Sequence, residues 1–235
     1  LFFELPWEDA EEGMCGRQLM SMYGNRDAAN NWERKYTGVL TAAGFVAGVG
    51  CVVLFVHVEL DIRMEVHGDD FIILADDEGF WFTVNVLKKE FDLKVRAVLG
   101  PEPKDDTDIT ILNRQMRFRR DVKPQRIELE GDPRHSEIII QQLSLAGCKG
   151  VDTPGVKHKA EEIIDASVNS PLLTGEKATA YRSVTMRAQY YSQDRPDICY
   201  ASKECARHMQ EPNEYDLSSL KRLGRYLVRY PRLVQ

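Results

Sequence analysis

The sequence predicts an α+β fold, in which a small antiparallel sheet with helices on one face precedes a mostly helical region. Residues 62–75 first alternate apolar and polar and then become continuously apolar after Gly68, which predicts two strands joined by a tight turn. Apolar residues recur at helical spacing over residues 28–43 and 76–91. Residues 178–230 are helical in pattern, with breaks at two prolines.

The N-terminal part predicts one helix between extended segments. We expect residues 1–16 to form a short extended segment and then a polar loop. Asn25 or Asp27 can cap the following helix, and Gly44 ends it. Residues 51–56 are rich in β-branched and large apolar side chains, which predicts a buried strand.

The next elements alternate between helix and strand. Trp32 and Tyr36 are spaced for a core-facing aromatic stripe on the first helix. The acids at 76–78 suit the N-terminus of the second helix, because they complement its dipole. Residues 93–99 predict another strand, and 100–108 a loop at a boundary between subdomains.

The middle of the chain predicts two strands and a helix. The strands are 109–118 and 126–129, joined through the basic turn 119–121. Asp132-Pro133 opens a helix that Gly147 closes.

The C-terminal part predicts a long connection and three helices. Residues 148–178 lack a clear apolar period, and a connection of this length is typical of a junction or a lid. Residues 195–197 and 211–213, each with a central proline, separate the three helices. The last helix gathers its leucines on one side, at positions 217, 220, 223 and 227.

The chain has 235 residues and a net charge of −6, which does not favour nucleic-acid binding through bulk charge. Basic residues nevertheless cluster at 114–126 and 221–232. For the first cluster, a solvated edge strand and a phosphate contact both remain open. Five singly placed cysteines argue against a disulfide framework and favour a reducing, intracellular compartment, cytoplasmic or nuclear. We interpret the apolar stretch 39–58 as core, with no membrane as partner.

Asp69 and Asp70 are the chemically distinctive residues, because two adjacent carboxylates follow a strand at a tight turn. Adjacent anions repel, so a fold that holds them together usually offers them a cation. A solvated acidic turn is the alternative, since turns favour Asp for local reasons.

Several motifs in order resemble the reverse transcriptase of copia-type retrotransposons. They begin with Tyr23–Trp32, continue with the Asp69-Asp70 hairpin, and are followed by shorter motifs at 152–154, 181–183, 195–198, 209–212 and 220–227. Their co-linear order over nearly the whole chain carries the resemblance. It implies that the chain is a fragment of a Pol polyprotein, from its RNA-directed DNA polymerase. Such a polymerase has the right-hand fold, with palm, fingers and thumb.

The resemblance implies three regions. Residues 1–100 would be a partial palm, 101–147 the palm–thumb junction and thumb start, and 148–235 the thumb and connection helices, without fingers or ribonuclease H domain. In this family a third catalytic Asp lies on an earlier strand, which we expect upstream of residue 1. The fragment alone would then be inactive.

The resemblance also implies two-metal nucleotidyl transfer, with Mg²⁺ or Mn²⁺ as cofactor and Asp69 and Asp70 as catalytic, metal-binding carboxylates. The expected partners are an RNA template, a DNA primer, deoxynucleoside triphosphates and the rest of the Pol polyprotein. The expected nucleotide or template contacts are Asn25, Arg26, Asp27, His67 and Gly68. The expected contacts to the primer backbone, by position only, are Arg117, Arg119 and Arg120.

Two other functions are open. Asp27, Ala29 and His67 stand where the family usually has Gln, Pro and an aromatic residue. The replaced Gln and the missing first catalytic motif favour a decayed, non-catalytic nucleic-acid-binding or interaction protein, whereas the intact Asp69-Asp70 pair does not. A different two-metal phosphoryl-transfer enzyme would need further carboxylates, for which Asp105, Asp106 and Asp108 are the candidates. No Ser or Cys sits in a nucleophile-elbow motif.

Overall fold

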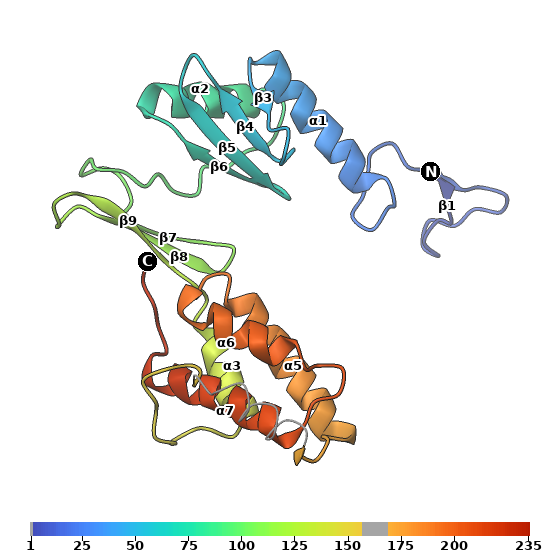
Figure 1. The fold of residues 1–235 in the computed structure, drawn as a ribbon. Helices are drawn as coiled ribbons and strands as arrows, with labels where there is room; N and C mark the ends of the chain where they lie inside the picture. Colours follow the sequence, from blue (N-terminus) through green and yellow to red (C-terminus); the bar gives the residue numbers. More distant parts are fainter. Residues whose placement is uncertain (1, 157–168) are drawn as a thin grey trace. The chain divides into compact units, whose positions relative to one another are not determined.

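The computed structural model describes residues 2–156 and 169–235, which form two compact units, Leu1–Arg96 and Ala97–Gln235 (Figure 1). Both units combine antiparallel strands with helices, as the α+β prediction requires. The finer division into palm, junction and thumb stays a prediction.

The first unit is built on a four-stranded antiparallel sheet in the order β3-β4-β5-β6. Its strands are β3 Val46–Ala47, β4 Leu54–His57, β5 Ile62–His67 and β6 Asp70–Leu74. Its helices are α1 Ala28–Ala42 and α2 Asp77–Lys88. A small pair, β1 Phe2–Phe3 and β2 Gly16–Arg17, precedes them.

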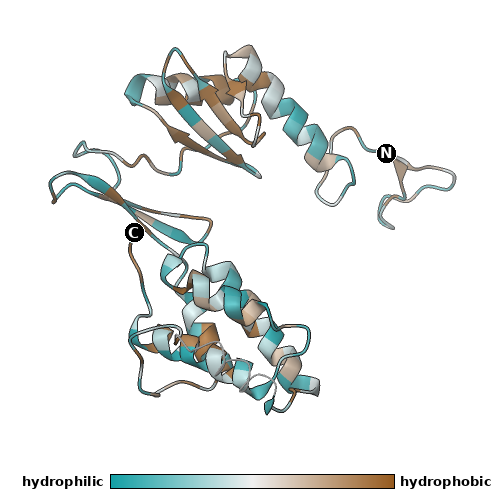
Figure 2. Cartoon of the chain, viewed as in Figure 1, coloured by the Kyte–Doolittle hydropathy of each residue, from teal (hydrophilic) through white to brown (hydrophobic). Residues whose placement is uncertain are grey.

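The two helices pack against one face of this sheet. In β5, Ile62, Met64 and Val66 are buried while the residues between them are exposed, as the alternating sequence predicts. They share a core with Tyr36 of α1 and Leu87 of α2. Figure 2 colours much of this sheet as hydrophobic.

Two strand predictions in the first hundred residues need correction. Residues 51–53 form a turn, so β4 begins only at Leu54, and Leu54 and Val56 are 44% and 40% exposed because their face of the sheet is not covered by α1 or α2. Residues 93–99 form no strand, since only Leu99 makes an isolated bridge, to Asp106. A strand needs a neighbour to pair with its backbone groups, and sequence composition does not supply one.

The second unit combines a three-stranded sheet with helices. The sheet has the order β7-β8-β9, with β7 Asp108–Ile111, β8 Arg114–Arg119 and β9 Arg126–Glu130. The helices are α3 Arg134–Gln142, α5 Gly175–Tyr191, α6 Pro196–Ala206 and α7 Glu214–Arg229. The three predicted C-terminal helices and the breaks between them are therefore confirmed.

Two boundaries of predicted elements differ from the structure, because residues that are not glycine adopt the left-handed backbone conformation there. The predicted strand 109–118 is a hairpin, since Leu112 and Asn113 take φ values of 49° and 64° and form its turn. Likewise, α3 ends at Gln142 rather than at Gly147, because Ser144 has a φ of 56°.

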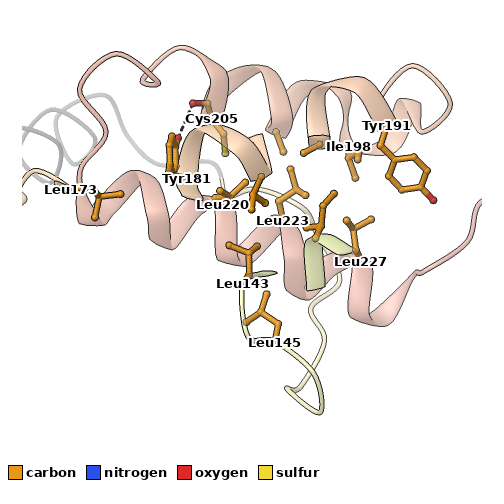
Figure 3. Packing of buried hydrophobic residues seen from close by; sticks show 14 of the residues in the cluster. Leu143, Leu145, Leu173, Tyr181, Tyr191, Ile198, Cys205, Leu220, Leu223 and Leu227 are labelled. Atoms are coloured by element: carbon orange, nitrogen blue, oxygen red, sulfur yellow. Dashed lines mark hydrogen bonds between the residues drawn. The ribbon is translucent and has the colours of Figure 1, made fainter. Parts of the chain in front are cut away.

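The helices of the second unit enclose its core (Figure 3). Leu220, Leu223 and Leu227 of α7 are fully buried there, as the one-sided leucine pattern predicts. The hydroxyl of Tyr181 in α5 donates a 2.8 Å hydrogen bond to the carbonyl of Cys205 in α6, which ties these helices together.

The predicted long connection 148–178 is described only at its two ends, and its centre, 157–168, lies outside the described residues. At one end Val151 donates its N–H to the carbonyl of Arg225, and at the other Leu172 bridges to Asn213. Both ends are thus attached to α7 or its N-terminal cap. None of the helices described here is long and apolar enough to cross a membrane.

Candidate functional site

The Asp69-Asp70 pair lies where β5 turns into β6. His67 and Asp70 are the last paired residues, so the loop between the strands contains only Gly68 and Asp69. Gly68 has a φ of 63°, which a glycine adopts without steric cost. Asp69 is exposed on the turn, whereas Asp70 is already a strand residue with a side chain 40% exposed. The tight turn at which both carboxylates were expected therefore contains only Asp69.

Trp32 of α1 holds this turn. Its indole Nε1–H donates a 2.6 Å hydrogen bond to the carbonyl oxygen of Gly68, 36 residues away in sequence. Its ring lies edge-on against Phe71, which directly follows Asp70, at a centroid distance of 6.2 Å, and against Phe91 at 5.1 Å. Helix α1 and the carboxylate-bearing turn are therefore joined by both a hydrogen bond and aromatic packing.

Arg96 forms an ion pair with Asp70, with its Nη1 3.7 Å from Oδ1 of the carboxylate. The Arg96 side chain is 68% exposed, so this ion pair is open to solvent and contributes little to stability. Asp69 is exposed and the Asp70 side chain is 40% exposed, so a ligand can still reach both carboxylates.

The donor set suits part of a divalent-metal site. Carboxylate oxygens are the hard ligands that Mg²⁺ and Mn²⁺ prefer, and Mg²⁺ keeps several coordination positions for water and phosphate oxygens. Across residues 2–156 and 169–235, no three His, Cys, Asp or Glu side chains gather to hold a metal. Asp69 and Asp70 could therefore supply two protein ligands to such a metal ion, from a turn that Trp32 holds in place.

Asn25, Arg26 and Asp27 lie at the start of α1. Neither candidate cap works as predicted: the Asn25 amide donates to Oε1 of Gln18 at 2.7 Å, and Asp27 makes no capping bond. Asp27 takes helical dihedrals, with φ −97° and ψ −1°, whereas a capping side chain needs an extended backbone to reach back to the helix. Arg26 and Asp27 are exposed.

Part of the predicted basic cluster, Arg114–Arg119, lies on β8, the middle strand of its sheet, so the edge-strand explanation is wrong for Arg117 and Arg119. Arg117 contacts Asp108 at 3.2 Å and Glu130 at 3.0 Å. Carboxylates on both neighbouring strands thus neutralise this part of the cluster.

The other two arginines are also engaged. Arg119 binds Asp121 and Glu128, and its hydrogen bonds lower the pKa of the Asp121 carboxyl to about 2. Arg120 donates instead to backbone carbonyls, those of Gly100 and Asp105. A phosphate contact by these arginines stays a prediction, and it would have to compete with the acids for Arg117 and Arg119.

Asp105, Asp106 and Asp108, the alternative candidates for a metal site, each bond to a nearby part of their own segment or sheet. A carboxylate oxygen of Asp105 accepts from the N–H of Glu102, and one of Asp106 from the N–H of Val98. Asp108 pairs with Arg117. Each of these carboxylates thus supports its own loop or hairpin.

Sequence reasoning missed Trp32 and Arg96 as neighbours of the acidic pair. Trp32 was interpreted only as core, and it is half-buried in the cluster around Tyr36. Nothing in the local pattern shows that its indole N–H meets a turn 36 residues away. Arg96 stands in a segment interpreted as a strand, so its position depended on a prediction that was wrong.

Comparison with known proteins finds similarity to a transposon polyprotein. Over 221 residues, 90% of the chain, it is 27% identical to the retrovirus-related Pol polyprotein from transposon RE1 of Arabidopsis thaliana. Over 96 residues it is 29% identical to an uncharacterized mitochondrial protein of the same plant. The matches span 13% and 36% of the lengths of these relatives. No family model and no solved structure matches the chain. These similarities relate the chain to a part of a retrotransposon Pol polyprotein.

Proposed function

We propose that this chain is the reverse transcriptase segment of a copia-type Pol polyprotein, which copies RNA into DNA by nucleotidyl transfer. The bond between Trp32 and Gly68 carries the proposal. It joins the Tyr23–Trp32 motif to the turn that bears Asp69 and Asp70, two motifs that the resemblance selects independently. The similarity to a transposon Pol polyprotein over 90% of the chain supports the same assignment.

In this proposal, each part of the turn has a distinct task. The Asp69 and Asp70 carboxylates bind Mg²⁺ or Mn²⁺, which when bound supplies Lewis-acid activation of the attacking hydroxyl and stabilises the leaving pyrophosphate. Gly68, which has no side chain, leaves room for a primer terminus to approach the exposed turn. The sheet and Trp32 keep the turn fixed while the substrates bind.

Primer extension on an RNA template tests this role, with the polypeptide expressed from the whole reading frame. We expect Asp69→Asn and Asp70→Asn to reduce incorporation to background, because each removes a negatively charged metal ligand. Asp61→Asn is the matched control: Asp61 lies on the preceding turn, 81% exposed, with a φ of 45° that Asn also tolerates. Full incorporation by Asp69→Asn would refute the proposal.

The same experiment separates the non-catalytic alternative. A decayed element would bind the RNA–DNA hybrid with an affinity that falls as salt increases, yet show no incorporation before substitution. Asp69→Asn would then leave binding unchanged or strengthen it, since it removes a negative charge.

A further inference from the structure

The two-residue turn that carries Asp69 could adopt either of two backbone conformations, the type I′ or the type II′ turn. A two-residue hairpin turn is of type I′ when both loop residues have positive φ, and of type II′ when only the first does. Gly68 has a φ of 63°, and among the described residues Asp69 is not one of those with positive φ, so the turn is of type II′. The two types differ mainly by rotation of the peptide between Gly68 and Asp69. Because Asp tolerates a left-handed φ better than most residues, sequence alone does not prevent that rotation.

The indole of Trp32 contacts this same peptide. Its N–H bonds to the carbonyl oxygen of Gly68, which belongs to the Gly68–Asp69 peptide unit. Rotating the peptide to the type I′ turn would carry this oxygen away from the indole and break a 2.6 Å hydrogen bond.

The indole itself is held in place. Its ring makes edge contacts with Tyr36, Phe71 and Phe91 at centroid distances of 5.6, 6.2 and 5.1 Å. Tyr36 is only 4% exposed and sits in the core of the first unit. A donor fixed by three aromatic neighbours can impose its geometry on a short exposed turn, rather than follow it.

We propose that Trp32 is a positioning residue that fixes the Gly68–Asp69 peptide and so directs the Asp69 carboxylate beside that of Asp70. This inference rests on the proposed function for the identity of the bound cation. Through the backbone dihedrals of Asp69, a peptide rotation would turn the direction of its side chain, and the two carboxylates would no longer share one ligand. Partners outside the first coordination shell typically change metal affinity by about 10- to 100-fold.

Mn²⁺ binding to the 235-residue chain tests the inference, with Trp32→Phe as the variant that keeps an aromatic ring and removes the N–H. We expect its Mn²⁺ dissociation constant to rise about tenfold. The amide resonances of Gly68 and Asp69 should shift without Mn²⁺, a readout that needs no activity. Trp81→Phe is the matched control, since Trp81 lies on α2 and is 49% exposed.

Asp69→Asn separates the two proposals. If it leaves Mn²⁺ binding unchanged, the metal site fails, whatever Trp32 does. If Asp69→Asn abolishes binding but Trp32→Phe changes neither the affinity nor the turn resonances, the positioning role is overturned. Turn resonances that shift while the affinity stays constant would also overturn it.

Hydrogen exchange in the unsubstituted chain covers the case in which Trp32→Phe does not fold. The indole proton of Trp32 should exchange more slowly than those of Trp7 and Trp81, which are 85% and 49% exposed. Equal exchange rates for Trp32 and Trp81 would show that the bond to Gly68 does not persist in solution, and would overturn the proposal.

Discussion

Arg195 is a fully buried cation, and its removal should strongly destabilise the helical unit. Its guanidinium makes a bidentate contact with Asp197, at 2.9 and 2.7 Å. It also donates to the carbonyls of Tyr230 and Pro231, just after α7. The side chain is 1% exposed, so its removal leaves Asp197 and these carbonyl oxygens without a buried partner.

The magnitude follows from the charge that is left behind. Burial has the largest single effect and acts to raise the pKa of Asp197. The hydrogen bonds and positive charge of Arg195, together with the hydroxyl of Tyr226 and a backbone hydrogen bond, outweigh it, so this pKa lies below its ordinary value. In Arg195→Ala the Asp197 carboxylate loses both hydrogen bonds from the guanidinium. It retains the 2.9 Å hydrogen bond from the hydroxyl of Tyr226. Breaking a buried ion pair costs about 3–5 kcal/mol. Because Asp197 is 20% exposed, we expect the lower end, about 3 kcal/mol.

Urea unfolding can assign this loss to one unit. The three tryptophans, Trp7, Trp32 and Trp81, all lie in Leu1–Arg96, so their fluorescence follows the first unit, while far-UV circular dichroism is dominated by helices of the second. With an m value of about 1.5 kcal/mol/M, the dichroism midpoint should fall by about 2 M. The fluorescence midpoint should not change.

Two controls test the cause. Arg207→Ala removes a 66% exposed arginine, paired with Glu204, and should cost under about 1 kcal/mol. Arg195→Met combined with Asp197→Leu should recover most of the loss, because no unpaired buried charge remains. An Arg195→Ala dichroism midpoint that falls by less than about 0.5 M would refute the reasoning.

Two further predictions concern titratable groups. At pH 8 the exposed thiols should react with a thiol reagent within minutes. Cys205 should react only on unfolding, because burial raises the pKa of its thiol to about 12. Rapid reaction of all the thiols in the folded chain would contradict this. Hydrogen bonds from Arg232, and less strongly from Arg117, hold the pKa of Glu130 below its ordinary 4.5 despite burial. Its stabilising contribution is therefore complete above about pH 4.5 and is lost as the pH falls through the lowered folded pKa. A carboxyl NMR titration should place the Glu130 midpoint below 4.5, and Arg232→Ala should raise it; a wild-type midpoint at or above 4.5 would contradict the ion pairs.

The sequence predicted the elements whose signal is local. The alternation in 62–66 predicted β5 with its buried face, and the prolines at 196 and 212 predicted where the C-terminal helices separate. Both signals work because periodicity and missing backbone N–H groups act within a few residues. The turn at Leu112-Asn113 was missed, since leucine rarely adopts a positive φ and gives no turn signal.

Charge placement depended on neighbours that the sequence does not reveal. The arginines at 117 and 119 were interpreted as a solvated edge or a phosphate contact. Strand pairing instead places acids of β7 and β9 beside Arg117, and Arg119 is paired with Glu128 of β9 and with Asp121. Residues 93–99 have strand composition and no neighbouring strand, so they stay irregular. Strand order is a long-range property, and composition alone cannot fix it.

The sequence by itself determined the α+β class, most helices and the adjacency of Asp69 and Asp70 at a glycine turn. Only the tertiary structure decided what that turn is attached to. Folding of α1 onto the sheet brings the Trp32 indole to the Gly68 carbonyl, and it leaves Asp69 in solvent while Asp70 joins β6. The physical reason is the separation in sequence over which each interaction acts. A turn is specified by its own residues. The side chain that fixes its peptide, by contrast, comes from a helix 36 residues earlier, and only the packing of that helix against the sheet brings the two together.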